Sequence, residues 1–99
     1  MAARKMITKD GKTLQVALSL ARDRIKSVSF SGDFYLYPEE SIRELEKSLE
    51  GITTSETEYQ IATRLMIAIR KAETDMAGVT CHEMAKVVKK AIDDAEGGF

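Results

Sequence analysis

The stretch KTLQVALSLARDRIKSVSFSG, residues 12–32, decides the fold of this 99-residue chain. Its first half alternates between apolar residues and small or polar ones, so an extended chain would carry on one side Leu14, Val16, Leu18 and Leu20. Alternation with period two over eight residues is typical of a half-buried strand. ARDR at 21–24 reads as a turn, and the alternation resumes after it. The stretch therefore predicts an antiparallel hairpin.

The second strand of this hairpin is expected to run on to Tyr37. If no bulge intervenes, its apolar face carries Val28, Phe30, Phe34 and Leu36. The turn signal KDG at 9–11 leaves room for a short preceding strand, RKMIT at 4–8. A sheet of two or three strands follows from these patterns.

Three amphipathic helices are expected after the sheet. Pro38 suits the first turn of a helix, where its missing N–H is not needed, and Gly51 suits the position after that helix ends. SETE at 55–58 and TCHE at 80–83 have the form of capping boxes that begin two more helices. The apolar stripe of the middle helix is predicted to contain Tyr59, Ala62, Leu65, Met66 and Ile69. The fold class is α+β, a small antiparallel sheet followed by three helices packed on one face.

The length, charge and cysteine content of the chain argue against several classes of protein. Residues 1–99 are expected to form one domain. Fifteen Lys and Arg against sixteen Asp and Glu argue against a nucleic-acid binder, which would show a basic excess. No apolar run approaches the roughly 20 residues of a membrane span. One cysteine and no export signal predict a cytoplasmic protein.

The second sheet face has no predicted helix to cover it. Its side chains are small and polar in the middle: Gln15, Ala17, Ser19, Ser29 and Ser31. A flat, weakly charged face with an aromatic edge is typical of a docking surface. The alternative is an ordinary antiparallel sheet with one face in water.

Reactive chemistry is not predicted. The chain has no phosphate-binding loop motif and no metal-ligand spacing, because its one Cys and one His are adjacent. Cys81 is either a thiol activated at a helix N-terminus or a plain first-turn residue. We therefore expect no catalytic residue, no bound metal and no activity from the chain alone.

The aromatic corner SGDFYLYPEES, residues 31–41, breaks several local rules at once. Gly32 interrupts a strand, and Tyr37 is a poor N-cap for the helix expected at Pro38. Such clusters tend to be functional or strained. Candidate partner-binding residues are Gly32, Asp33, Phe34, Tyr35, Tyr37 and Pro38. The alternative is that these residues have a purely structural role, in which Asp33 caps the helix and Phe34 and Leu36 lie in the core.

Residues 11–51 resemble the C-terminal accessory domain of lipoate–protein ligases, in its separately encoded archaeal form. The matching features are a Gly-Lys start, an Ile-x-x-Val-x-apolar strand, a Gly-Asp-Phe-aromatic corner and a helix ending in Glu-Gly; here they are Gly11-Lys12, Ile25, Val28, Phe30, Gly32-Asp33-Phe34-Tyr35 and Glu50-Gly51. Gly78-Val79-Thr80 before the last helix also resembles the family. Cys81-His82-Glu83 departs from the family's Pro-Glu-Asp but keeps the capping pattern.

The resemblance implies an accessory subunit of a bipartite ligase. Such a subunit pairs with a large catalytic subunit in a heterodimer and is required mainly when ATP and lipoate form lipoyl-adenylate. The acyl group then passes to a lysine of carrier domains of the E2 and H-protein type. Lipoate, ATP and Mg²⁺ would be bound by the complex and not by this chain alone, and neither nucleic acid nor membrane is an expected partner.

Two other functional classes remain. The fold also looks like that of iron–sulfur scaffolds of the NifU type, but those need three cysteines and Cys81 stands alone. A non-catalytic protein–protein adaptor of the same fold is the main alternative.

Overall fold

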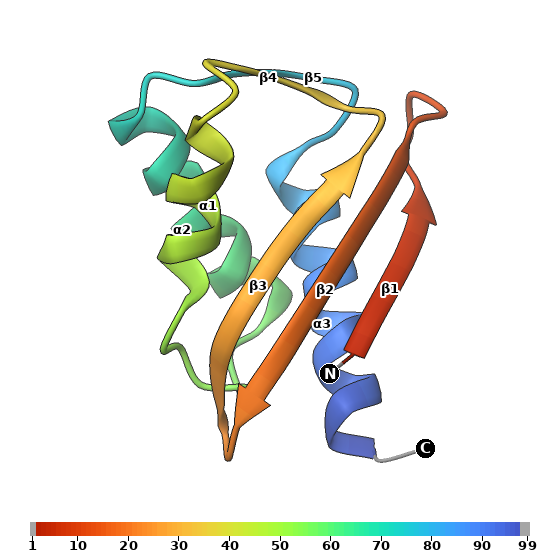
Figure 1. Ribbon diagram of the computed structural model, residues 1–99, viewed down its shortest axis with the longest axis vertical. Coiled ribbons are helices and arrows are strands. Elements are labelled where there is room, and N and C mark those ends of the chain that lie inside the picture. The colour runs from red at the N-terminus through yellow and green to blue at the C-terminus, as the bar shows by residue number, and fades with distance from the viewer. Residues whose placement is uncertain (1, 98–99) are drawn as a thin grey trace.

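Three antiparallel strands in the order β1–β2–β3 form the main sheet, and all three helices lie on one side of it (Figure 1). The computed structural model describes residues 2–97. The predicted α+β class is confirmed. In chain order, the elements are β1 (Ala2–Ile7), β2 (Thr13–Ala21), β3 (Arg24–Gly32), β4 (Tyr35–Tyr37), α1 (Ser41–Leu49), α2 (Glu58–Lys71), β5 (Asp75–Ala77) and α3 (Cys81–Gly97).

The predicted hairpin is β2–β3, and it contains a bulge. Ser19 lies opposite Ser27 while the next residue, Leu20, lies opposite Ile25, so β3 has one extra residue at Lys26. A bulge of this kind shifts the side-chain alternation by one position. Ile25 and Val28, three residues apart, therefore both face the core, with exposures of 1% and 4%.

The strand does not run on to Tyr37, which corrects the prediction. β3 ends at Gly32, whose φ is +145°, and β4 leaves the main sheet to pair with β5 in a second, two-stranded sheet. A Cβ at Gly32 would lie 2.1 Å from the backbone oxygen of Thr13. Only glycine allows β2 and the departing chain to approach this closely. β5 itself was not predicted.

The core lies between the main sheet and the helices. α3 packs on β1 and β2, α1 packs on β3, and α2 packs on α1 and α3. The side chains buried without measurable exposure include Leu14, Val16, Leu18, Leu45, Leu49, Ile61, Leu65, Met84, Val88 and Ile92. The alternation in β2 and the helical spacing of α1 and α3 place their apolar residues on facing sides of this layer.

Two of the three predicted helix starts are wrong by a few residues. α1 begins at Ser41 with Glu40 as N-cap, so Pro38 does not lie in the first turn and Tyr37 is not the N-cap. The capping box of α2 is Thr57 with Gln60, and not the predicted box at 55–58. The third box is confirmed, because the Glu83 N–H donates to Thr80 Oγ1 at 3.1 Å and the Thr80 N–H donates to Glu83 Oε1 at 3.0 Å.

A buried carboxylate holds α1 against β3. Glu46 is buried, and its Oε2 accepts a 2.9 Å hydrogen bond from the backbone N–H of Phe30. Its Oε1 lies 3.0 Å from Arg43 Nη1. β3 is an edge strand, so this N–H would otherwise lack a partner inside the protein.

Candidate partner-binding surface

The aromatic corner lies at one end of the molecule and is braced from several sides. β4 pairs with β5 along its whole length, with Leu36 opposite Met76. The backbone N–H of Asp33 donates to the carbonyl of Thr13 at 2.9 Å. These bonds fix the corner to β2 and to the segment before α3 (Figure 1).

The loop between β1 and β2 is tied to the same end. Thr8 is buried and its hydroxyl donates to the carbonyl of Gly78 at 2.8 Å. A Cβ on Gly78 would lie 3.0 Å from Lys12 Cγ and 3.5 Å from Phe34 Cα. Three segments far apart in sequence therefore meet around the corner and leave it little freedom to move.

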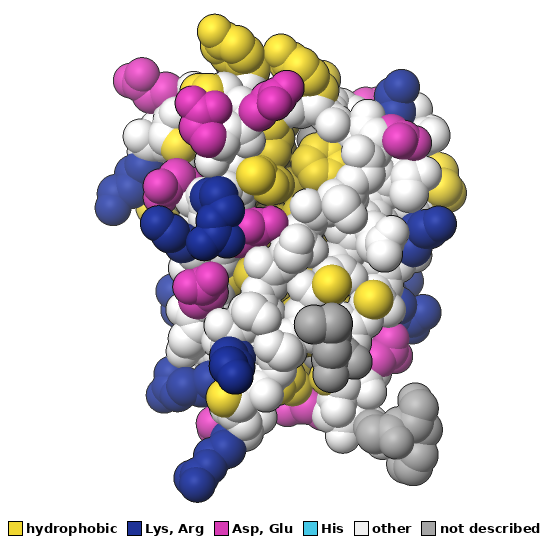
Figure 2. Space-filling model, viewed as in Figure 1, with side chains coloured by type: hydrophobic (Ala, Val, Ile, Leu, Met, Phe, Trp, Pro, Cys, Tyr) yellow, Lys and Arg dark blue, Asp and Glu magenta, His cyan; other side chains and the backbone are white. Residues whose placement is uncertain are grey.

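The side chains of β4 alternate between core and solvent. Leu36 is buried, while Tyr35 and Tyr37 are 53% and 60% exposed. Phe34 and Pro38 are half-buried, and Phe34 packs against the core. In Figure 2, hydrophobic side chains protrude at the top of the view, where Figure 1 places β4. Tyr35 and Tyr37 therefore point into solvent from a strand whose central residue, Leu36, is buried.

Asp33 does not cap α1, so the structural alternative for this residue is wrong. The N-cap position of α1 is Glu40, without a side-chain cap. Asp33 is exposed, and within residues 2–97 only its backbone forms a hydrogen bond. Its carboxylate is free to meet a partner.

The uncovered sheet face joins this corner through β3. Gln15, Ala17 and Ser19 are half-buried by their neighbours, and Ser29 and Ser31 are exposed. The hydroxyls of Ser19 and Ser27 lie 2.7 Å apart across the hairpin. Figure 2 shows this face as mainly uncharged, with Lys, Arg, Asp and Glu toward its margins. The predicted flat, weakly charged face is therefore present.

Reactive groups do not gather at the corner. Among the described residues, no three His, Cys, Asp or Glu side chains are placed to hold a metal ion. Cys81 is half-buried, and burial raises the pKa of its thiol, which favours the plain first-turn residue over the activated thiol. In residues 2–97, no helix has the length and apolarity needed to cross a membrane.

α2 carries exposed apolar side chains that the sequence reasoning placed in the core. Tyr59 and Met66 are exposed, while Ile61 and Ala68, which were not predicted, are buried. The buried stripe is rotated around the helix relative to the prediction. The spacing of Ile61, Ala62, Leu65, Ala68 and Ile69 is the signal that would have found it.

Comparison with known proteins finds similar proteins from Thermoplasma acidophilum; no family model matches the chain. Lipoate-protein ligase A subunit 2 is 47% identical over 38 residues, which are 38% of this chain and 40% of that protein. A chain of a solved archaeal lipoylation system, described as a bipartite lipoate protein ligase and its E2 lipoyl domain, superposes with a TM-score of 0.70. That likeness covers 87% of this chain and 91% of the other at 24% identity.

The structural likeness establishes a shared fold, and the sequence match covers two fifths of the length of the ligase subunit. The sequence match is to a ligase subunit, the kind of protein that the hairpin, the Gly-Asp-Phe-Tyr corner and the Glu-Gly helix end resemble. The predicted resemblance is thereby confirmed: the chain is similar to the small accessory subunit of an archaeal bipartite lipoate–protein ligase.

Proposed function

We propose that this chain is the accessory subunit of a bipartite lipoate–protein ligase. It pairs with a large catalytic subunit and supports the ATP-dependent conversion of lipoate to lipoyl-adenylate, before the acyl group passes to a lysine of a lipoyl-carrier domain. The observation that carries the proposal is the weakly charged, uncovered face of the main sheet, together with the exposed Tyr35 and Tyr37 on the strand that follows β3. The similarity to a ligase subunit supports it.

The corner suits a docking role because it is rigid and partly apolar. Large aromatic side chains contribute much of the binding energy at protein interfaces, and a braced segment loses little conformational entropy on binding. Tyr35 and Tyr37 stand on a strand held by β5, with Leu36 buried beneath them. We assign these two tyrosines to the contact with the catalytic subunit, and Gly32, Asp33, Phe34 and Pro38 to its support and margin.

Adenylation makes demands that a subunit without reactive groups can meet. The carboxylate of lipoate attacks the α-phosphorus of ATP, and pyrophosphate leaves. Water must be kept from the mixed anhydride, and the reactants must be held in line. A capping subunit supplies order and exclusion, while the catalytic subunit holds lipoate, ATP and Mg²⁺.

An adaptor of the same fold with no enzymatic partner is the second candidate. The observation that favours it is the exposed Tyr35 and Tyr37 beside the uncovered sheet face, a surface that could dock on a partner of any kind. An iron–sulfur scaffold has no such support, because Cys81 is the one cysteine of the chain.

Separate assay of the two half-reactions distinguishes the candidates. The catalytic subunit of the same organism is tested with and without this chain, first with lipoate and ATP and then with preformed lipoyl-adenylate and a carrier domain. A ligase subunit forms a stable complex and raises the rate of the first reaction more than the second. An adaptor changes neither rate.

A further inference from the structure

The outer side of α2 carries three exposed hydrophobic side chains in a row. Tyr59, Met66 and Ile67 are 78%, 48% and 54% exposed. Their positions i, i+7 and i+8 place them on one face of the helix, above the buried Ile61 and Leu65. We call these three residues the α2 ridge. Half of the six large hydrophobic side chains exposed in residues 2–97 belong to it.

The α2 ridge borders two grooves: of its three residues only Ile67 lines the first, whereas all three line the second. The first lies between α1 and α2 and has a volume of about 580 Å³. The second, of about 450 Å³, lies between α2 and the start of α3 and is lined by Ala62, Thr63 and His82 among others. Ile67 lines both grooves, so it stands between them. The surface therefore has an exposed apolar side chain, Ile67, between two hollows, each large enough for side chains of another protein.

The grooves are rimmed by positive charge, although the chain as a whole has a net charge of −1. Their linings contain four cations, Lys47, Arg64, Arg70 and Lys71, against one carboxylate, Glu44. Arg64 is already held by Glu56 through two hydrogen bonds of 2.7 and 2.6 Å. Lys47, Arg70 and Lys71 have no ion-pair partner within residues 2–97.

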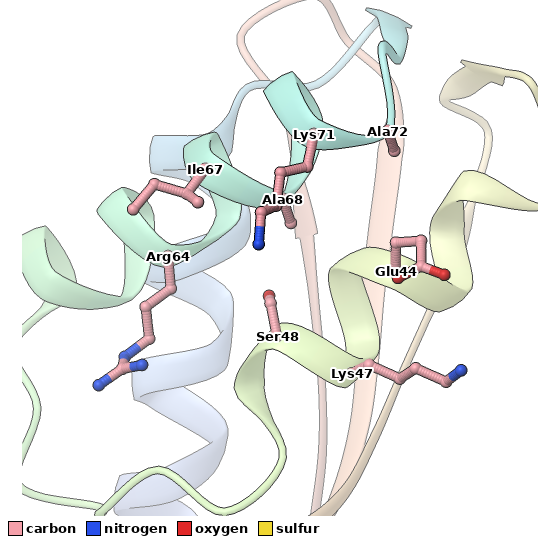
Figure 3. Close-up of a pocket in the computed structure, with 8 residues that line it drawn as sticks. All are labelled: Glu44, Lys47, Ser48, Arg64, Ile67, Ala68, Lys71 and Ala72. Atoms are coloured by element: carbon pink, nitrogen blue, oxygen red, sulfur yellow. The ribbon is translucent and has the colours of Figure 1, made fainter.

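The first groove shows how these charges are arranged. In Figure 3, Lys71 reaches from α2 toward Ser48 on α1, while Lys47 points outward from the rim and Arg64 turns away from α1. Ile67, Ala68 and Ala72 supply the apolar part of the lining. An occupant of this groove would need apolar side chains beside carboxylates.

We propose that the α2 ridge and its two grooves are a docking site for an acidic amphipathic helix of a partner protein. Apolar side chains of that helix, spaced at i, i+3, i+4 and i+7, would straddle the ridge and enter the grooves. Carboxylates on its flanks would face Lys47, Arg70 and Lys71. Charge complementarity selects the partner, since a basic helix would meet like charges at both margins.

The shape of the surface favours a protein over a membrane. Helices that lie in a lipid interface present a broad, convex apolar face. Here the apolar ridge is narrow and the grooves beside it would stay unfilled against lipid headgroups. The site also differs from the aromatic corner, because it lies on α2 and α1, with the start of α3, and contains no residue of β3 or β4.

Two synthetic helices test the proposal on the full chain. Both are 14 residues long, as α2 is, with leucines at i, i+3, i+4 and i+7; one carries Glu and the other Lys at the flanking positions. Binding is followed by two-dimensional NMR of the labelled chain. The Glu peptide is expected to shift amide signals of α2 and α1, and to lose affinity when salt is raised from about 0.1 M to about 1 M. The Lys peptide is expected not to bind.

Variants of the chain test separately how charge and how apolar shape contribute to binding of the peptides. Arg70→Glu with Lys71→Glu should weaken the Glu peptide by roughly tenfold or more, because two weak attractions become repulsions, and should admit the Lys peptide. Met66→Ser with Ile67→Ser should abolish binding without changing the fold seen by NMR. Lys26→Glu on the distant bulge is the matched control and should change neither affinity.

Four results would overturn the proposal. One is equal binding of the two peptides, and another is no binding of either. A third is a concentration-dependent dimer that Met66→Ser and Ile67→Ser abolish, which would make a second copy the occupant. The fourth is binding of the chain to anionic phospholipid vesicles through α2 in place of the Glu peptide, which would make a membrane the occupant.

Discussion

Replacement of Gly32 by alanine tests whether the aromatic corner is held by the close approach of two strands. The new Cβ would lie 2.1 Å from the oxygen and 2.9 Å from the carbon of the Thr13 carbonyl. Both contacts are with backbone, so β2 and the start of the corner must move apart. The move would break the 2.9 Å hydrogen bond from the Asp33 N–H to the Thr13 carbonyl.

The expected loss of stability follows from two effects. An alanine at a φ of +145° costs on the order of 1–3 kcal/mol in backbone strain. The overlap with Thr13 adds about 1–3 kcal/mol, as overpacking in a dense region does. We therefore expect Gly32→Ala to lower the free energy of unfolding by about 2–6 kcal/mol.

Gly11→Ala is the matched control. Gly11 also has a positive φ, +78°, but nothing lies within 4 Å of its added Cβ. It should lose only about 1–2 kcal/mol, the cost of the left-handed conformation. Urea unfolding followed by far-UV circular dichroism gives both free energies by linear extrapolation. If the two variants differ by less than about 0.5 kcal/mol, the contact with Thr13 does not hold the corner.

Two further substitutions and one chemical reaction test other parts of the molecule. Tyr35→Ala should leave the free energy of unfolding unchanged, because this side chain is exposed, and should weaken the complex with the catalytic subunit by about 1–3 kcal/mol in a calorimetric titration. Glu46→Ala should lower the free energy of unfolding by about 1–3 kcal/mol, since it leaves the buried N–H of Phe30 without an acceptor; urea unfolding measures this. Cys81 should react with iodoacetamide at pH 7–8 more slowly than a cysteine in an unfolded peptide. The reason is that burial raises the pKa of its thiol and so lowers the fraction present as thiolate. An equal or faster rate would show an activated thiol.

The hairpin and the helical layer could be predicted because their signals are local. Leu14, Val16 and Leu18 alternate without interruption, and a strand with one buried face requires that pattern. The capping box at Thr80 and Glu83 matches the structure, because both of its hydrogen bonds join residues only three positions apart.

The elements that were missed depend on contacts between distant segments. β5 has only three residues, and it is a strand because β4 leaves the main sheet and needs a partner. α1 begins at Ser41 and not at Pro38, because β4 continues to Tyr37 and a turn is needed before the helix. In α2, the buried stripe is set by packing against both α1 and α3, which the sequence of one helix does not reveal.

The sequence predicted a partner-binding surface at residues 31–41, and that role stays a prediction; what the sequence did not reveal is how the corner is built. The local signals in residues 31–41 located the corner, and the structure places Tyr35 and Tyr37 outward as expected. The brace formed by Thr8, Thr13 and Gly78 comes from segments up to 70 residues apart and has no signature in the local sequence. The α2 ridge was hidden because its apolar residues resemble core residues until the packing is known.

Titration of the catalytic subunit with this chain, with pyrophosphate release from lipoate and ATP as the signal, tests the central claim most directly. We predict no release from this chain alone, a rate that rises with added chain and saturates at one chain per catalytic subunit, and a weaker response with Tyr35→Ala and Tyr37→Ala combined. A rate that is the same with and without this chain would contradict the account.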